Sequence, residues 1–270
     1  MNCFRLLLFT VSIYILYLES VTTHFYIKQW KSSNDNRLRP AQKADLSHSA
    51  YRSSSDNIGW IGSKFLTSNH AIVCGASNTP KGKVAPAGGR FFSDASHAAG
   101  QTLEVNAGGH ITLVITNGGG TGYPHYEGHI QAYLGYCGAS PIACQSFDAS
   151  KAYFFKIQES INGVKRLRRQ MSHSLGGDVW EVPIPAGVPR GSYILRFEII
   201  TPHESVASEG FQDQYYPSCG QIYVKSNRNS VHLNQLPLLR LPGGYENRNM
   251  KASQAPGPRL ASFNSLRLRN

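Results

Sequence analysis

His24 stands directly after a segment with the features of a secretion signal, so it can become the first residue of a mature chain. An N-terminal histidine offers two nitrogen ligands from one residue, its α-amine and its imidazole. A second histidine elsewhere would complete a planar set of three nitrogens. Nitrogen ligands in a tetragonal arrangement suit Cu(II) in particular. The sequence therefore raises the hypothesis of a copper site, provided that the chain is cut before His24.

The N-terminal segment has the charge and hydropathy of a signal peptide. A short positive start, residues 1–5, precedes an apolar run over residues 6–18 that is too short to span a bilayer as a helix. Polar residues follow at once. We predict a signal peptide over residues 1–23. A cut after Ser20 is the alternative, and it would leave extra residues in front of His24.

Composition indicates an exported, basic protein with a sizeable core. Of its 270 residues, 41% are hydrophobic and 11% aromatic, and the formal net charge is +11. Part of the positive excess lies in residues 165–169, which we interpret as a solvated loop or a surface that attracts acidic wall polymers. A nucleic-acid function for this run is a weaker hypothesis. We expect an extracellular monomer with no membrane or nucleic-acid partner.

Cysteine usage agrees with export. Of the five cysteines, Cys3 would leave with the signal. An even number in a secreted chain predicts disulfides, here two with three possible connectivities. Cys137 and Cys144 are close enough to close one local loop, and that pairing would leave Cys74 and Cys219 to close a very long one.

The rest of the chain has the pattern of short strands separated by turns. Apolar runs or alternating residues, bounded by Gly, Pro, Ser or Asn, occur at residues 111–116, 130–134, 153–157, 180–184, 193–200 and 220–224. This spacing predicts an all-β, immunoglobulin/fibronectin-like β-sandwich with long loops. We predict one domain over residues 24–250. Residues 251–270 are polar and basic, and we predict a disordered tail there.

Several residues near strand ends are candidates for a site. His125 lies in a loop with Pro and Gly neighbours, and His129 begins the next predicted strand. His203 follows the strand at 193–200. The stretch 214–219 is dense in polar aromatic groups and ends in a cysteine. Loops held by a rigid sheet are common places for functional side chains, but spacing alone does not assign roles among these residues.

A series of motifs resembles one known family. The motifs are Gly59-Trp60-Ile61, Gly128-His-Ile-Gln-Ala-Tyr-Leu134, Trp180-Glu-Val-Pro-Ile-Pro185, Gly191-Ser-Tyr-Ile-Leu-Arg-Phe-Glu-Ile-Ile200, Gln214-Tyr-Tyr-Pro-Ser-Cys219-Gly-Gln-Ile222 and Pro242-Gly-Gly-Tyr245. The fifth is close to the family's Gln-Phe-Tyr-Pro-x-Cys-x-Gln-Ile. In this order, after an N-terminal histidine, they make residues 24 to about 249 similar to the fungal lytic polysaccharide monooxygenases of auxiliary activity family 9, formerly glycoside hydrolase family 61.

The resemblance implies roles for particular residues. One copper ion would be held by the amine and imidazole of His24 and by His125, with Tyr216 on the axial side. Gln214 and His203 match a pair that hydrogen-bonds to an oxygen species near the metal. Tyr245 matches an aromatic residue on a flat, copper-bearing surface that faces the substrate.

The resemblance also implies an activity. Members of the family cleave β-1,4-glucan chains of the cellulose type oxidatively, using dioxygen or hydrogen peroxide. The implied partners are an insoluble polysaccharide and a small-molecule or protein electron donor. Cys74 with Cys219 matches the family's long-range disulfide.

Two departures from the family leave alternatives open. The loop from His125 to His129 is one residue longer than the family's His-x-Gly-Pro, so His129 is a second candidate for the ligand. Phe197 stands where the family has a histidine. A secreted copper- or polysaccharide-binding sandwich without oxidative activity is therefore one alternative. A hydrolase with paired carboxylates, Glu127 and Glu198, is the other.

Overall fold

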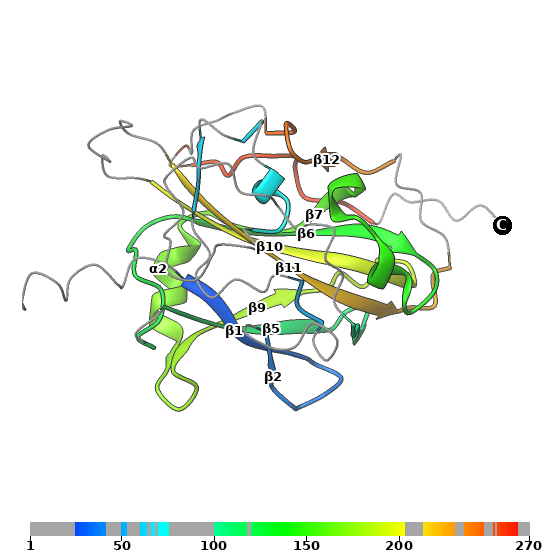
Figure 1. Ribbon diagram of the computed structural model, residues 1–270, viewed down its shortest axis with the longest axis horizontal. Helices are drawn as coiled ribbons and strands as arrows, with labels where there is room; N and C mark the ends of the chain where they lie inside the picture. Colours follow the sequence, from blue (N-terminus) through cyan, green and yellow to red (C-terminus); the bar gives the residue numbers. More distant parts are fainter. Residues whose placement is uncertain are drawn as a thin grey trace, which may run out of the picture.

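The computed structural model describes residues 25–41, 50–52, 60–63, 66–67, 70–75, 100–117, 120–202, 213–229, 235–245, 251 and 253–263. These residues form two β-sheets packed face to face (Figure 1). Within these ranges, helix is limited to the short α2 and a few single turns of 3-10 helix. The predicted β-sandwich is confirmed.

The first sheet has five strands, and every neighbouring pair in it is antiparallel. Its order is β2-β1-β5-β9-β8, with bounds β1 Phe25–Ser32, β2 Arg39–Pro40, β5 His110–Asn117, β8 Met171–Ser172 and β9 Gly177–Pro183.

The second sheet is larger. Its order is β12-β7-β6-β10-β11-β3, and β4 pairs in parallel with β11. The bounds are β3 Ile61–Gly62, β4 Leu103–Asn106, β6 His129–Gly138, β7 Tyr153–Ser160, β10 Gly191–Thr201, β11 Gln214–Lys225 and β12 Leu238–Arg240.

The central strand β10 of the second sheet is buried on both faces and has apolar residues on each side. In β10, Leu195 and Phe197 belong to the core between the sheets, together with Trp180 of β9. Ile194 and Ile200 point the other way, into a second cluster that includes Ile72 of the 3-10 helix η3 (His70–Ile72). Every residue of β10 is buried as a result.

One glycine permits the close approach of the two sheets. A Cβ built on Gly220 of β11 would lie 2.0 Å from the ring of Trp30 in β1. The Trp30 ring is buried and has no room to move aside. Gly220 therefore lets a large aromatic residue of the first sheet lie against the backbone of the second.

Each of the six predicted strands falls on an observed one, namely β5, β6, β7, β9, β10 or β11. The main omission is β1, which pairs with β5 along its whole length. A second omission is the start of β11, where residues 214–219 are strand. The start of each omitted segment, Phe25 in β1 and Gln214 in β11, lies at the end of the sandwich that carries the candidate site.

The prediction of a loop at residues 165–169 is wrong, although Lys165, Arg166 and Arg169 are exposed to solvent as predicted. These residues fall in helix α2 (Gly163–Leu167) and the 3-10 turn η6 (Arg168–Gln170). Val164 and Leu167 are fully buried in the inter-sheet core, which anchors the helix. The guanidinium of Arg166 lies 4.2 Å from the centre of the Trp180 ring. Burial of these two side chains and this cation–π contact hold the basic run in place.

The predicted disordered tail over residues 251–270 is also wrong for the part that the structure describes. Phe263 is only 6% exposed and packs in the inter-sheet core. The backbone of Ala261 donates to the carbonyl of Lys156 in β7, and the Lys156 ammonium donates to the carbonyl of Pro256. The ordered domain therefore extends past residue 250, alongside β7.

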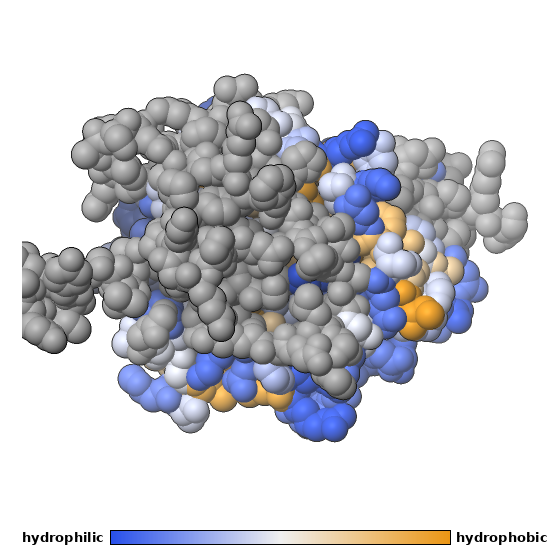
Figure 2. All heavy atoms as spheres, viewed as in Figure 1, coloured by the Kyte–Doolittle hydropathy of each residue, from blue (hydrophilic) through white to orange (hydrophobic). Residues whose placement is uncertain are grey.

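Both predicted disulfides are present. Cys74 pairs with Cys219 across 145 residues, and Cys137 pairs with Cys144 across seven. No helix within the described ranges is long and apolar enough to cross a membrane. On the face drawn in Figure 2, hydrophilic side chains dominate the described surface, and hydrophobic ones form small separate areas.

Candidate functional site

His125, Tyr216 and Gln214 come together at one end of the sandwich. The Nε2 atom of His125 lies 3.1 Å from the hydroxyl oxygen of Tyr216. The Tyr216 hydroxyl donates to Oε1 of Gln214. Gln214 and Tyr216 are two residues apart at the start of β11, so both side chains leave the strand on the same face. His125 reaches them from the loop between β5 and β6.

The start of β1 completes this end of the sandwich. The Phe25 ring lies 4.9 Å from the ring of Tyr123 and 5.0 Å from that of Tyr216, measured between centroids. Phe25 pairs with Asn117 at the end of β5, which fixes where the strand begins. His24 precedes Phe25 in the chain but lies, with the signal segment 1–23, outside the described residues. His203 lies outside them as well.

The polar groups of this cluster differ in burial. Tyr216 is 1% exposed and Gln214 is 5% exposed, whereas His125 is half-buried. Burial raises the pKa of the Tyr216 phenol well above its usual value. Tyr216 therefore stays a neutral hydroxyl at physiological pH, with its single proton directed to Gln214. The hydroxyl oxygen keeps its lone pairs for a second partner on the His125 side.

A buried carboxylate holds the start of the His125 loop. Oδ2 of Asp178, in β9, accepts a hydrogen bond from the backbone N–H of Tyr123 at 2.7 Å. Asp178 is 2% exposed, and burial raises the pKa of its carboxyl, while the Tyr123 N–H and the Arg168 charge oppose that shift. The carboxylate thus fixes the loop two residues before His125.

A guanidinium holds the same loop through its next two residues. Nη1 of Arg168 donates to the carbonyl oxygens of Pro124 and His125, at 3.1 Å each. The guanidinium also lies 3.8 Å from the centre of the Tyr126 ring. Sequence reasoning missed both Arg168 and Asp178, because nothing in the basic run at 165–169 distinguishes the one arginine that reaches this loop.

His129, the alternative ligand, has no ring nitrogen available at the surface. It is fully buried at the start of β6. Its Nδ1 accepts from the backbone N–H of Asn162 at 3.1 Å, and its Nε2 lies 2.7 Å from the carbonyl oxygen of Lys251. Since both nitrogens are already bonded within the fold, His125 is left as the predicted second histidine.

The prediction that Tyr245 lies on a substrate-facing surface is wrong. Tyr245 is 2% exposed, and its hydroxyl donates to Glu198 and accepts from Arg196 at 3.2 Å. Its ring packs against Tyr215, with 5.7 Å between centroids. Tyr245 is therefore part of the cluster on the outer face of the second sheet.

The hydrolase alternative requires two accessible carboxylates, Glu127 and Glu198, and Glu198 is not accessible. Glu198 is fully buried, and it accepts hydrogen bonds from Arg196, Gln131 and Tyr245. Glu127 is exposed and pairs with Lys165 at 3.3 Å. A buried carboxylate with all these donors has no access to a polysaccharide, so these two residues do not form a glycosidase site.

The donors at the site end fit a copper ion. An imidazole nitrogen is a ligand that copper binds well, and an oxygen can serve as a weaker axial partner. The 3.1 Å between His125 Nε2 and the Tyr216 hydroxyl lets both atoms contact one ion. Within the described ranges, no three side chains of His, Cys, Asp or Glu gather as a metal site. His24, the predicted first ligand, precedes Phe25 in the chain and lies outside those ranges.

Comparison with solved structures defines the class of fold. Cel61B from Hypocrea jecorina, a glycoside hydrolase family 61 member, matches with a TM-score of 0.58 and 20% identity, over 88% of this chain and 100% of that one. A cellulose-active polysaccharide monooxygenase from M. thermophila matches with a TM-score of 0.60 and 18% identity, again over 88% and 100%. At these identities the likeness shows a shared fold.

The family model described as Auxiliary Activity family 9 (formerly GH61) matches residues 24–254, and the chain belongs to this family. The AA9 family lytic polysaccharide monooxygenase D of Gloeophyllum trabeum is 28% identical over 189 residues, which are 63% of this chain and 52% of that protein. The AA9 family lytic polysaccharide monooxygenase A of Gibberella zeae is 32% identical over 161 residues, which are 56% of this chain and 44% of that protein. The chain thus spans about half the length of the curated relatives it matches.

Proposed function

We propose that this chain is a secreted, copper-dependent lytic polysaccharide monooxygenase. Family membership supports the proposal. The observation that carries it is the convergence of His125, Tyr216 and Gln214 beside the start of β1. Three segments far apart in the sequence meet there, and the residue types are those expected around copper.

In this proposal, copper would be held by the amine and one imidazole nitrogen of His24 and by Nε2 of His125, beside the Tyr216 hydroxyl. Bound copper would supply one-electron chemistry that activates dioxygen or hydrogen peroxide with electrons from an external donor. Gln214 and His203 would orient the dioxygen or hydrogen peroxide by hydrogen bonds. Gln214 is positioned for this by its bond to the Tyr216 hydroxyl.

The fold supports this site by fixing positions rather than by moving protons. Asp178 and Arg168 hold the backbone of the His125 loop by hydrogen bonds at successive residues. Phe25 and Tyr123 pack against Tyr216 and exclude water from its ring. Such support by neighbouring groups commonly sets both ligand orientation and metal affinity.

The remaining parts of the proposal follow from the resemblance to the family. Residues 1–23 would direct secretion and be removed to expose the His24 amine. The substrate would be an insoluble β-1,4-glucan of the cellulose type, docked on a flat face around the copper. The electron donor would be a small molecule or a partner protein, and the enzyme would act as a monomer.

The test is an assay for oxidised products. Copper-loaded protein is incubated with amorphous cellulose, oxygen and ascorbate, and the soluble fraction is analysed by mass spectrometry. We expect oxidised oligosaccharides that appear only with reductant and disappear with a chelator. The His125→Ala variant should give none, whereas His110→Ala, which removes a half-exposed histidine at the other end of β5, should match wild type.

Other outcomes identify the alternatives. Unmodified oligosaccharides that form without reductant and survive a chelator would indicate a hydrolase. Tight copper binding without any oxidised product would indicate a binding sandwich. Phe197 supported that second alternative in the sequence, but it packs in the inter-sheet core and contributes an apolar side chain there.

A further inference from the structure

Tyr126 is an exposed aromatic residue directly beside the proposed ligand His125. Its side chain is 72% exposed, the highest value among the large apolar side chains of the described ranges. One face of the ring lies on the Arg168 guanidinium, 3.8 Å from the ring centre. A cation stacked on one face holds the ring in a fixed orientation and leaves the other face open to solvent.

A shallow hollow of about 380 Å³ lies next to this ring. It is lined by Tyr126, Glu127, Lys165, Arg168 and Arg169. The Lys165 ammonium pairs with Glu127 at 3.3 Å, and Arg169 is exposed, with its Nε donating to the carbonyl of Lys165. The lining therefore carries three cations against one carboxylate, and its net charge is positive.

This combination suits one chemical class of ligand. An aromatic face packs against the C–H face of a sugar ring by dispersion and weak C–H contacts. Arginine and lysine side chains bind carboxylates by charge-assisted hydrogen bonds. A neutral glucan would use the ring and leave the net positive charge of the lining unmatched. A glycan with carboxylate groups would use both.

We propose that Tyr126, Arg169 and Lys165 form a binding subsite, beside the copper position, for a β-linked polysaccharide that carries carboxylate groups. The inference rests on the proposed function for its choice of a polysaccharide. Tyr126 would stack on one sugar ring, and the two cations would meet carboxylates on that ring or the next. Arg168 acts indirectly, by holding both Tyr126 and the backbone of His125.

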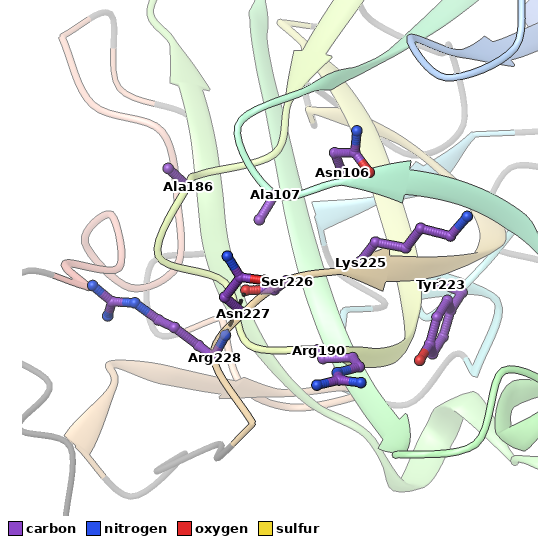
Figure 3. Close-up of a pocket in the computed structure, with 9 residues that line it drawn as sticks. All are labelled: Asn106, Ala107, Ala186, Arg190, Tyr223, Lys225, Ser226, Asn227 and Arg228. Atoms are coloured by element: carbon purple, nitrogen blue, oxygen red, sulfur yellow. Dashed lines mark hydrogen bonds between the residues drawn. The ribbon is translucent and has the colours of Figure 1, made fainter.

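A second basic hollow, at the opposite end of the sandwich, could also attract a polyanion. It is lined by Arg190, Lys225 and Arg228, among others (Figure 3). Lys225 ends β11, at whose other end Gln214 lies, so this hollow is remote from His125. Tyr153, at the start of β7, is also 48% exposed and has a cation near its ring, the guanidinium of Arg240 at 5.8 Å. These residues supply matched controls.

The experiment measures binding of copper-free, full-length mature protein to two soluble polymers. Carboxymethyl cellulose and hydroxyethyl cellulose share a β-1,4-glucan backbone, and only the first carries carboxylates. We expect Tyr126→Ala to weaken binding of both polymers about three- to tenfold, and Tyr153→Ala to change neither. We expect Arg169→Gln to weaken binding of carboxymethyl cellulose alone, about two- to fivefold at low salt, with Arg190→Gln unchanged.

Equal losses in Arg169→Gln and Arg190→Gln would overturn the inference, because they would show general attraction between a cationic protein and a polyanion. Equal effects of Tyr126→Ala and Tyr153→Ala would overturn it too. Since copper is absent, the result does not depend on redox activity. If these contrasts fail while wild type forms oxidised products, the subsite is wrong and the proposed function stands. If the contrasts hold and no oxidised products form, the subsite stands and the proposed function is wrong.

Discussion

At the scale of single residues, the hydrogen-bond donors and acceptors of the site allow only one arrangement. The Tyr216 hydroxyl has one proton, and Gln214 takes it. The oxygen then faces His125 as an acceptor, which requires a proton on His125 Nε2 in the metal-free protein. Copper at that nitrogen would replace this hydrogen bond. The metal-free protein therefore already holds the imidazole in a defined direction, which lowers the entropic cost of binding.

Arg168 provides the most specific prediction at this scale. Arg168→Gln removes both hydrogen bonds to the carbonyls of Pro124 and His125, so the loop that carries His125 becomes less well ordered. We expect copper affinity to fall about tenfold, the size seen when groups that support a metal ligand are lost. Isothermal titration calorimetry with copper measures this affinity.

The control for this variant is Arg190→Gln, which removes the same charge at the far end of the sandwich. Its copper affinity should equal that of wild type. Equal affinities in Arg168→Gln and wild type would show that the His125 loop keeps its position without the guanidinium. Thermal unfolding of both variants distinguishes a local effect on the loop from a general loss of stability.

At the scale of elements, β10 illustrates how alternation distributes chemistry between two faces. Leu195, Phe197 and Ile199 face the inter-sheet core. Arg196 and Glu198 face outward, where they form a fully buried ion pair. Glu198 also accepts from Gln131 at 2.7 Å and from Tyr245. Both charged side chains are thus satisfied within the cluster covered by η3 and Tyr245.

This ion pair predicts a large difference between two glutamates. Glu198→Ala leaves the Arg196 charge buried without its carboxylate, and we expect a loss of about 3–5 kcal/mol in the free energy of unfolding. Glu104→Ala removes a carboxylate from a half-exposed pair with Lys225 and should cost about 1 kcal/mol or less. Urea denaturation measures both. Similar losses in the two variants would mean that the buried pair contributes little.

The strands were predictable where alternation is regular, and β1 shows why one was missed. A register shift between Ile27 and Gln29 brings Trp30 onto the same buried side as Phe25 and Ile27. This bulge breaks the period of two that identifies a strand in a sequence. The burial of Tyr245 could not be predicted from the sequence either, since it depends on the Arg196–Glu198 pair that its hydroxyl contacts.

At the scale of the whole molecule, the C-terminal segment is a structural part of the sandwich. Composition suggested disorder, because residues 251–270 are polar and basic. The order of residues 253–263 comes instead from backbone bonds to Lys156 and from the insertion of Phe263 into the core. The Phe263 ring packs against Phe155 with 5.7 Å between centroids. Such contacts depend on the folded partner and leave no local pattern in the sequence.

Two substitutions in this segment test its contribution. Phe263→Ala removes a ring that is 6% exposed, and we expect the free energy of unfolding to fall by about 3 kcal/mol. Leu260→Ala removes a side chain that is 49% exposed and should change stability by about 0.5 kcal/mol or less. Chemical denaturation measures the difference. Equal stability of the two variants would show that the packing of this segment against the core does not stabilise the fold.

Long-range assembly also limits how much of the site a sequence reveals. Spacing placed His125 and residues 214–219 at strand ends, and the family's motifs proposed their roles. The loop supports, Asp178 and Arg168, come from β9 and the turn after α2, which neither spacing nor the motifs connect to His125. Their identification required the packed sandwich.

The central claim is a copper site built on an N-terminal histidine. The most direct measurement is a copper titration of the secreted protein, with the intact mass recorded on the same sample. We predict a mass that begins at His24 and tight binding of one copper ion per chain, abolished in both His24→Ala and His125→Ala. A mature chain that begins elsewhere, or that binds no copper tightly, would contradict the account and leave a sandwich of this family without its metal chemistry.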